Sequence, residues 1–126
     1  VKIGSNVVIT GDTTISDGCE IYPFACIGTS PQHLRFKGEE TKVFIGKDNV
    51  IREYVTINRG TEKGGGVTTV GNKCLFMISS HIAHDCHVGN NVIIGANSMV
   101  KGVCLDNSVY AGCPAVFKKS LNAVPS

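Results

Sequence analysis

The chain has 126 residues, of which 42% are hydrophobic and 17% charged, so it has the length of one domain and is too apolar for a disordered segment. Twelve basic and ten acidic residues leave a formal charge of +2, which excludes the strong basic field of a nucleic-acid or anionic-membrane binder. Five Phe, three Tyr and no Trp, against fifteen Gly and four Pro, indicate a core of small and branched side chains and argue against a helical bundle.

Large apolar residues recur every six positions along the chain, in three blocks. The residue four places further on is nearly always small, and glycine often follows directly after the large one. This period is neither the 3.6-residue repeat of a helix nor the sustained alternation of long strands. It predicts an all-β protein of one domain, 1–126, in which short strands joined by tight corners stack as a parallel β-helix. The large positions are Ile3, Ile9, Ile15, Ile21, Ile27, Ile45, Ile51, Ile57, Val70, Phe76, Ile82, Val88, Ile94 and Val100.

Two breaks interrupt the repeat, near 29–42 and 60–69. The first is polar, basic in its middle and contains Pro31 and Gly38, which predicts a loop that leaves the coil. The second contains Gly64-Gly65-Gly66 and is expected to be flexible. Insertions in a solenoid often form binding surfaces, although tolerated surface loops are the alternative interpretation.

Four of the six cysteines occupy the small position of the repeat, which predicts buried thiols rather than a disulfide framework. These are Cys19, Cys74, Cys86 and Cys104. Cys86 and Cys104 are eighteen residues apart and are expected to lie one above the other, so they form the one pair to check for a bond. Reduced thiols fit a cytoplasmic protein, and the short apolar runs predict no membrane span.

Three of the four histidines fall in one segment, Ser80-His81-Ile82-Ala83-His84-Asp85-Cys86-His87. The phase of the repeat places Ile82 and Cys86 inside the prism and the polar residues outside or at a corner. An imidazole beside a carboxylate is a common arrangement for a general base near neutral pH. Clustered histidines also hold zinc, but the spacing here ranks a metal site below acid/base catalysis, and no metal is predicted.

The hexads resemble the hexapeptide-repeat family, whose left-handed parallel β-helix has three hexads per coil, so about five coils are expected. From about Glu20 to Gly102 the chain also resembles the UDP-N-acetylglucosamine O-acyltransferases of lipid A synthesis. EIYPFACIG, IREYVTINRGT, GGGVTTVG and HIAHDCHVGNN carry that resemblance. It implies a homotrimer with active sites between prisms, which moves a hydroxyacyl chain from acyl carrier protein to the 3-hydroxyl of the nucleotide sugar, with no bound cofactor.

The same resemblance assigns roles to individual residues. His84 matches the catalytic base, Asp85 its orienting partner, and Gly102 the glycine whose N–H stabilises the oxyanion. Gly102 is eighteen residues beyond His84, so a base and an N–H donor are expected on one face in successive coils. Four residues match substrate-binding positions: Gln32, Arg35, Asn58 and His81.

The chain also differs from that family at several positions. His33 replaces an acidic residue, Asn58 and Val103 replace histidines, and no C-terminal helical domain is expected. The final segment, with AGCPA at 111–115, resembles hexapeptide acetyltransferases that use acetyl-CoA, and Lys118 and Lys119 could meet a cofactor phosphate. An acetyl-CoA-dependent sugar acetyltransferase and an inactive β-helix are therefore the alternative functions.

Overall fold

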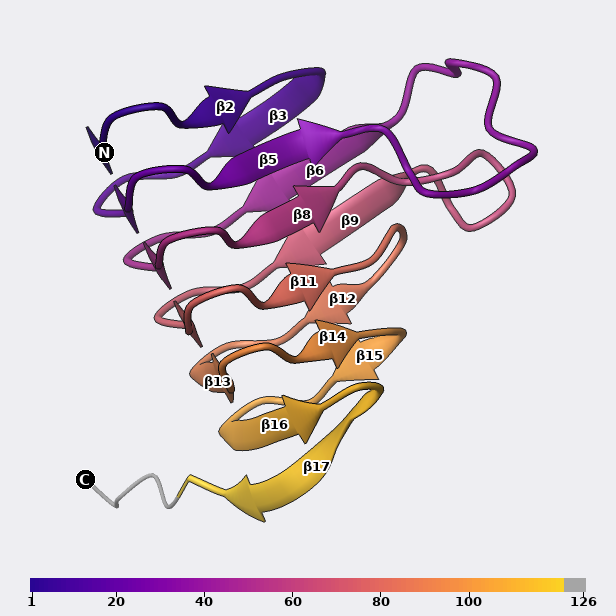
Figure 1. The fold of residues 1–126 in the computed structure, drawn as a ribbon. Helices are drawn as coiled ribbons and strands as arrows, with labels where there is room; N and C mark the ends of the chain where they lie inside the picture. Colours follow the sequence, from indigo (N-terminus) through magenta and orange to yellow (C-terminus); the bar gives the residue numbers. More distant parts are fainter. Residues whose placement is uncertain (122–126) are drawn as a thin grey trace.

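A computed structural model describes residues 1–121 as a stack of short strands with three flat sides (Figure 1). The strands are β1 (Lys2–Ile3), β2 (Val8–Ile9), β3 (Asp12–Ile15), β4 (Glu20–Ile21), β5 (Cys26–Thr29), β6 (Lys42–Ile45), β7 (Val50–Ile51), β8 (Thr56–Asn58), β9 (Val67–Val70), β10 (Leu75–Phe76), β11 (His81–Ile82), β12 (His87–Val88), β13 (Val92–Ile94), β14 (Met99–Val100), β15 (Val103–Cys104), β16 (Ser108–Gly112) and β17 (Ala115–Ser120). Within these residues no helix has the length and hydropathy needed to cross a membrane.

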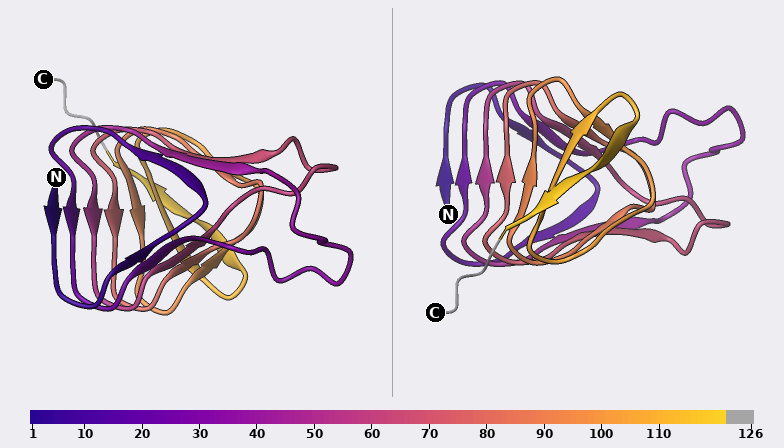
Figure 2. Two further views of the ribbon diagram at one scale, coloured as in Figure 1. Left: turned by 90° about the horizontal axis from the view of Figure 1, so that it is seen from above. Right: turned by 90° about the horizontal axis from the view of Figure 1, so that it is seen from below.

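The strands form three sheets, each built from one strand of every coil. Their orders are β1-β4-β7-β10-β13-β16-β17, β14-β11-β8-β5-β2 and β15-β12-β9-β6-β3, and all pairs are parallel except β16 with β17. Five coils of three strands are followed by β16, and β17 folds back beside it. Seen from the N-terminal end in Figure 2 (left), the chain turns anticlockwise as it recedes, which makes the coil left-handed. The predicted left-handed parallel β-helix of about five coils is confirmed.

The interior of the prism is filled by the large residues of the repeat. From Ile21 to Val100 each of them is between 0% and 3% exposed. The first coil differs, because Ile3 is 54% and Ile9 38% exposed. That coil has a neighbour on only one side among the described residues, so its large side chains are covered on one side only.

The corners depend on a left-handed backbone conformation at a fixed position. At two of the three corners of each coil, and at Asp85 in the third corner, the third residue after the large one has a positive φ, which is between 55° and 69° where it is not glycine. Asn and Asp tolerate this region better than most side chains. The chain can thereby change direction within a few residues. The residues in this conformation are Asn6, Phe24, Asp48, Tyr54, Lys73, Ser79, Asp85, Asn91, Asn97 and Asn107.

The glycine after the large residue has a steric cause at Gly71. A Cβ atom there would lie 2.4 Å from Oδ1 of Asn90 in the next coil. That oxygen accepts a hydrogen bond from the backbone N–H of Asn72 at 2.8 Å. Glycine leaves room for this side chain to link two successive coils.

One corner of the fifth coil is two residues shorter than the repeat predicts. Ile82 pairs with Val100, eighteen residues on, whereas Val88 pairs with Cys104, only sixteen residues on. Cys104 therefore takes a large position of the repeat, and its assignment to the small position was wrong. Cys19, Cys74 and Cys86 are buried as predicted.

The shortened corner also changes the expected relation of Cys86 to Cys104. Cys86 is not in register with Cys104, and its thiol donates to the carbonyl of Val100 at 3.4 Å. All six cysteines are free thiols.

Two segments leave the coil at the same corner of the prism. Residues 30–41 connect β5 to β6, and residues 59–66 connect β8 to β9. They protrude side by side in both views of Figure 2. At the C-terminal end of the stack, β17 lies under the last coil, where the ring of Phe117 packs edge-on against Tyr110 with centroids 5.9 Å apart. The loops therefore mark one edge of the prism as different from the other two.

Candidate active site

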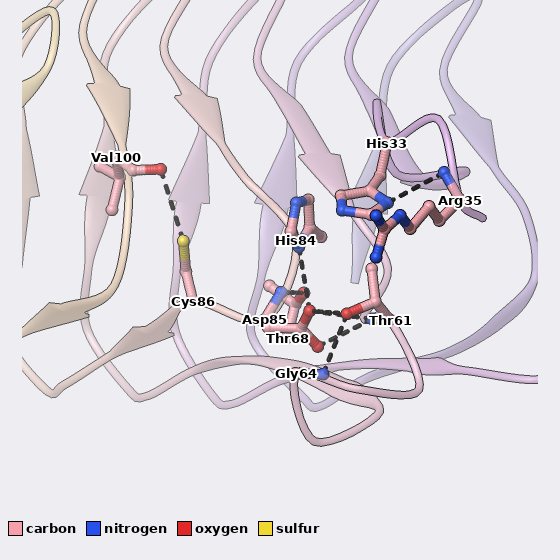
Figure 3. Close-up of polar contacts among 9 residues, drawn as sticks. All are labelled: His33, Arg35, Thr61, Gly64, Thr68, His84, Asp85, Cys86 and Val100. Atoms are coloured by element: carbon pink, nitrogen blue, oxygen red, sulfur yellow. Dashed lines mark hydrogen bonds and ion pairs between the residues drawn. The ribbon is translucent and has the colours of Figure 1, made fainter.

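His84 and Asp85 lie at the loop-bearing edge, in the corner between β11 and β12. Nδ1 of His84 is 2.9 Å from Oδ2 of Asp85 (Figure 3). A carboxylate is an acceptor only, so it holds the proton of the neutral imidazole on Nδ1 and leaves the Nε2 lone pair free. The His84 side chain is 32% exposed and the Asp85 side chain 11%. The pair therefore presents a partly exposed base backed by a largely buried carboxylate.

Asp85 is held by residues from the second loop and from β9. The backbone N–H of Thr61 donates to Oδ1 at 2.8 Å and to Oδ2 at 3.0 Å, and the Thr61 hydroxyl donates to Oδ2 at 2.5 Å. The N–H of Asp85 donates to Oγ1 of Thr68 at 2.9 Å. Burial raises the pKa of Asp85, but the hydrogen bonds from Thr61 and His84 outweigh it and lower the pKa below its ordinary value. Asp85 is ionised at neutral pH.

The glycines of the second loop make room for this carboxylate. A Cβ at Gly60 would lie 2.6 Å from Oδ1 of Asp85, and one at Gly64 would lie 2.1 Å from Oδ2. The loop itself is tied by hydrogen bonds from Gly64 N–H to the Thr61 hydroxyl and from Gly66 N–H to the Thr61 carbonyl. Of the three glycines that predict a flexible loop, only Gly64 permits close approach to Asp85, whereas a Cβ at Gly65 or Gly66 would meet no atom within 4 Å.

Two further histidines lie beside His84. His81, on β11, has Nδ1 2.6 Å from Oγ1 of Thr56 in the coil above. Burial and the neighbouring His84 lower the pKa of His81, so it is neutral at neutral pH. His33 packs edge-on against His84 with ring centroids 5.6 Å apart, and its Nδ1 accepts the backbone N–H of Arg35 at 3.2 Å (Figure 3). His33 was not among the predicted site residues.

A hollow of about 1050 Å³ separates the two loops. His33, Arg35, Lys37 and Glu39 line it from the first loop, and Thr61, Glu62 and Lys63 line it from the second. Among the described residues no carboxylate forms an ion pair with the three cationic side chains. The hollow adjoins the His84 corner through His33 and Thr61, and its lining carries three cationic and two acidic side chains.

The other predicted substrate-binding residues are more widely spread. Gln32 is exposed on the first loop and lies outside the lining of the hollow. Asn58 is only 4% exposed at the base of the loops, where its amide donates to the hydroxyl of Thr29 at 3.0 Å. The structure thus places His81 beside His84 and Arg35 beside His33 in the hollow. Gln32 lies outside the lining of the hollow, and Asn58 lies beneath the loops.

Gly102 lies at the same edge one coil further on, within the shortened corner. Its φ of 83° is in the left-handed region that favours glycine. Its carbonyl accepts the N–H of His87 at 3.0 Å, while no acceptor within residues 1–121 takes the N–H of Gly102. A side chain at Gly102 would meet no atom within 4 Å, so the surroundings are open.

The corner offers no thiol nucleophile beside His84. Cys86 is 0% exposed, and burial raises its pKa. Within residues 1–121, no group of three or more His, Cys, Asp or Glu residues is arranged to hold a metal ion. The chemistry available at this corner is that of a base, its carboxylate partner and backbone donors.

Comparison with known proteins places these features in a family context. The model of the bacterial transferase hexapeptide (six repeats) matches residues 67–102, which include the His84 corner. The acyl-(acyl-carrier-protein)-UDP-N-acetylglucosamine O-acyltransferase of Caulobacter vibrioides is 48% identical over 102 residues, covering 81% of this chain and 39% of that protein. The enzyme of the same name from Paracoccus denitrificans is 54% identical over 93 residues, covering 73% and 36%. The chain thus spans less than half the length of these relatives.

Solved structures agree with the fold. The UDP-N-acetylglucosamine O-acyltransferase of Moraxella catarrhalis superposes with a TM-score of 0.68 at 30% identity, over 95% of this chain and 65% of that one. A serine acetyltransferase in complex with cysteine gives a TM-score of 0.75 at 24% identity, over 94% and 43%. At that identity the second likeness concerns the fold alone.

Proposed function

We propose that this chain, a hexapeptide-repeat β-helix similar in sequence to UDP-N-acetylglucosamine O-acyltransferases, moves an acyl group from an acyl carrier protein thioester to the 3-hydroxyl of a UDP-N-acetylglucosamine-type sugar. The observation that carries the proposal is the His84–Asp85 pair, a base with a free Nε2 beside a hollow between the two loops. The relatives named as acyltransferases of this kind add support, since their similarity to the chain extends over this corner.

In the proposed reaction, Nε2 of His84 takes the proton of the sugar hydroxyl while its oxygen attacks the thioester carbonyl carbon. Asp85 stabilises the imidazolium that forms. The tetrahedral intermediate collapses as the carbon–sulfur bond breaks, and the leaving sulfur receives the proton from His84. The attack is direct and forms no covalent enzyme intermediate, in keeping with the burial of Cys86.

Gly102 is proposed to stabilise the oxyanion. Its N–H lacks an acceptor within the described residues and lies at the same edge of the prism, one coil beyond His84. A preorganised N–H donor at such a place stabilises developing negative charge.

Arg35 and His81 are proposed to bind the substrate near His84. Arg35 lines the hollow, and His81, neutral at neutral pH, offers its remaining ring nitrogen beside His84. Gln32 and Asn58 are proposed to bind the sugar in an assembly or loop arrangement that brings them to the His84 corner.

A homotrimer is proposed as the active form. In one chain the His84 side chain remains 32% exposed, so a neighbouring prism would exclude water from the site. Light scattering on the purified chain should give three times the chain mass. A monomer with full turnover would contradict the trimer.

The donor is tested by supplying two thioesters with UDP-N-acetylglucosamine. Product formation with a 3-hydroxyacyl acyl carrier protein, detected as O-acylated nucleotide sugar by mass spectrometry, is the expected result. Acetylated product from acetyl-CoA instead would favour the sugar acetyltransferase, which the AGCPA segment at 111–115 resembles. No product from either donor with several nucleotide sugars would overturn the proposed activity and leave an inactive β-helix.

A further inference from the structure

The carboxylate of Asp85 is reached by a chain of hydrogen bonds that begins at the backbone of the second loop. The N–H of Gly64 is a donor only, and it lies 3.1 Å from Oγ1 of Thr61. The hydroxyl therefore accepts from Gly64 and donates its own proton onward to Oδ2 of Asp85. Nδ1 of His84 donates to the same oxygen. Gly64 thus donates to Thr61, and Thr61 and His84 both donate to the same oxygen of Asp85.

The geometry points to Thr61 as a positioning residue: its hydroxyl and backbone N–H hold the Asp85 carboxylate in the one orientation that keeps His84 in its Nδ1–H tautomer. This inference rests on the proposed function, in which Nε2 of His84 must be free to accept a proton. It assigns the second loop a part in the chemistry without any contact between that loop and the reacting atoms.

Several features of the loop are explained together by this role. Thr61 places both of its polar donors on one carboxylate, which a side chain without a hydroxyl could not do. Glycine at 60 and 64 is required for the carboxylate to fit, since a Cβ at either place would collide with it. Successive hydrogen bonds of this kind strengthen one another and rigidify the group at their end. The loop therefore acts as a cradle for Asp85.

Asp85 has no comparable alternative orientation that serves His84. Its backbone is fixed by φ of 62° and by the bond from its N–H to Thr68. Freed from the Thr61 hydroxyl, Oδ2 would keep one weaker bond to the Thr61 N–H and could turn away from Nδ1. The imidazole would then be free to place its proton on either nitrogen, and the share of molecules with a free Nε2 would fall.

The test is nuclear magnetic resonance of ring nitrogens in protein labelled with 15N-histidine, which carries only four histidines. His84 is assigned by loss of its signals in His84→Gln. In the wild type at pH 8, Nδ1 of His84 should show the shift of a protonated nitrogen and Nε2 that of an unprotonated one. Thr61→Val should reduce the Nδ1–H form by about half or more, and Thr61→Ser should restore it.

Thr69→Val is the control, because it removes a threonine hydroxyl that contacts a different histidine directly, Nδ1 of His87 at 2.8 Å, outside the corner. It should leave the His84 shifts unchanged. Wild-type His84 shifts in folded Thr61→Val would overturn the inference, and Thr61→Ala replaces that variant if it does not fold. In an active enzyme, Thr61→Val should also lower kcat about tenfold with KM for the sugar unchanged. The ring shifts need no turnover, so they test the cradle even if the proposed acyl transfer fails.

Discussion

The prism and the loop-bearing edge are built in different ways. In the prism, residues six apart share one environment, and large side chains from Ile21 to Val100 are 0% to 3% exposed. At the edge, His84 and Asp85 depend on single residues from distant segments, such as Thr61, Thr68 and His33. The difference teaches that stability is spread over many equivalent positions, whereas the chemistry depends on a few contacts that occur once. Substitutions in the two regions should therefore affect different measurements.

The largest effect on stability is expected inside the prism. Ile57 on β8 is 0% exposed, and Ile57→Ala should lower the free energy of unfolding by about 2–5 kcal/mol, because it removes buried methyl groups and leaves a cavity. Urea unfolding at fixed protein concentration measures it. Ile78→Ala is the control, since Ile78 is 45% exposed and should cost less than about 0.5 kcal/mol. Equal losses in both variants would break the distinction between core and surface.

The next effect concerns the carboxylate of the edge. Asp85→Asn should lower kcat by about 10–100-fold, because an amide has one acceptor oxygen for donors that now share two. The unfolding midpoint should change far less than the rate. Asp106→Asn serves as the control, since Oδ1 of Asp106 accepts the N–H of Asn90 at a different corner. A wild-type rate in Asp85→Asn would show that the pair is not used in turnover.

The smallest effect is a dependence of stability on pH through His81. Its pKa is lowered in the folded state by burial and by His84, whereas the unfolded histidine has its ordinary pKa of about 6.5. The unfolded chain therefore binds more protons than the folded chain near this pKa. The contribution of His81 to the free energy of unfolding should be largest above about pH 7 and should decline as the pH falls toward 5. Thermal unfolding at several pH values measures it. His81→Gln should flatten this decline, and an unchanged slope would rule out His81 as its source.

The architecture could be predicted because its cause lies in every hexad. One large and one small residue per six fill a narrow prism, and the left-handed corner residue recurs at the same phase at two of the three corners of each coil. The failure at Cys104 has an equally local cause. The corner after Val100 lacks two residues, so a count of six from Val100 reaches the exposed Asp106. Cys104 and Tyr110, which are six apart, are buried instead and pair with Val88 and Ile94, so the signal was a change of phase at the end of the repeat.

The site could be predicted only in part. His84 and Asp85 are adjacent in sequence, so their pairing is visible in a single motif. Thr61 is 24 residues from Asp85, and its contact depends on how the second loop folds over a corner in the next coil. The run Gly64-Gly65-Gly66 predicts mobility, whereas in the structure the Asp85 carboxylate explains why positions 60 and 64 have no side chain. His33 could not be predicted as a neighbour of His84, because nothing in the repeat places the first loop at that corner.

The central claim is that the edge supplies a base from His84, and it is tested most directly by the rate of acyl transfer in two histidine variants. His84→Ala should lower turnover by about 10²–10⁴-fold while the protein stays folded, because a partly exposed imidazole adds little to the core. His87→Ala, three residues away on the outer face of β12, should keep the wild-type rate. Wild-type turnover in folded His84→Ala, or an equal loss in both variants, would contradict the account.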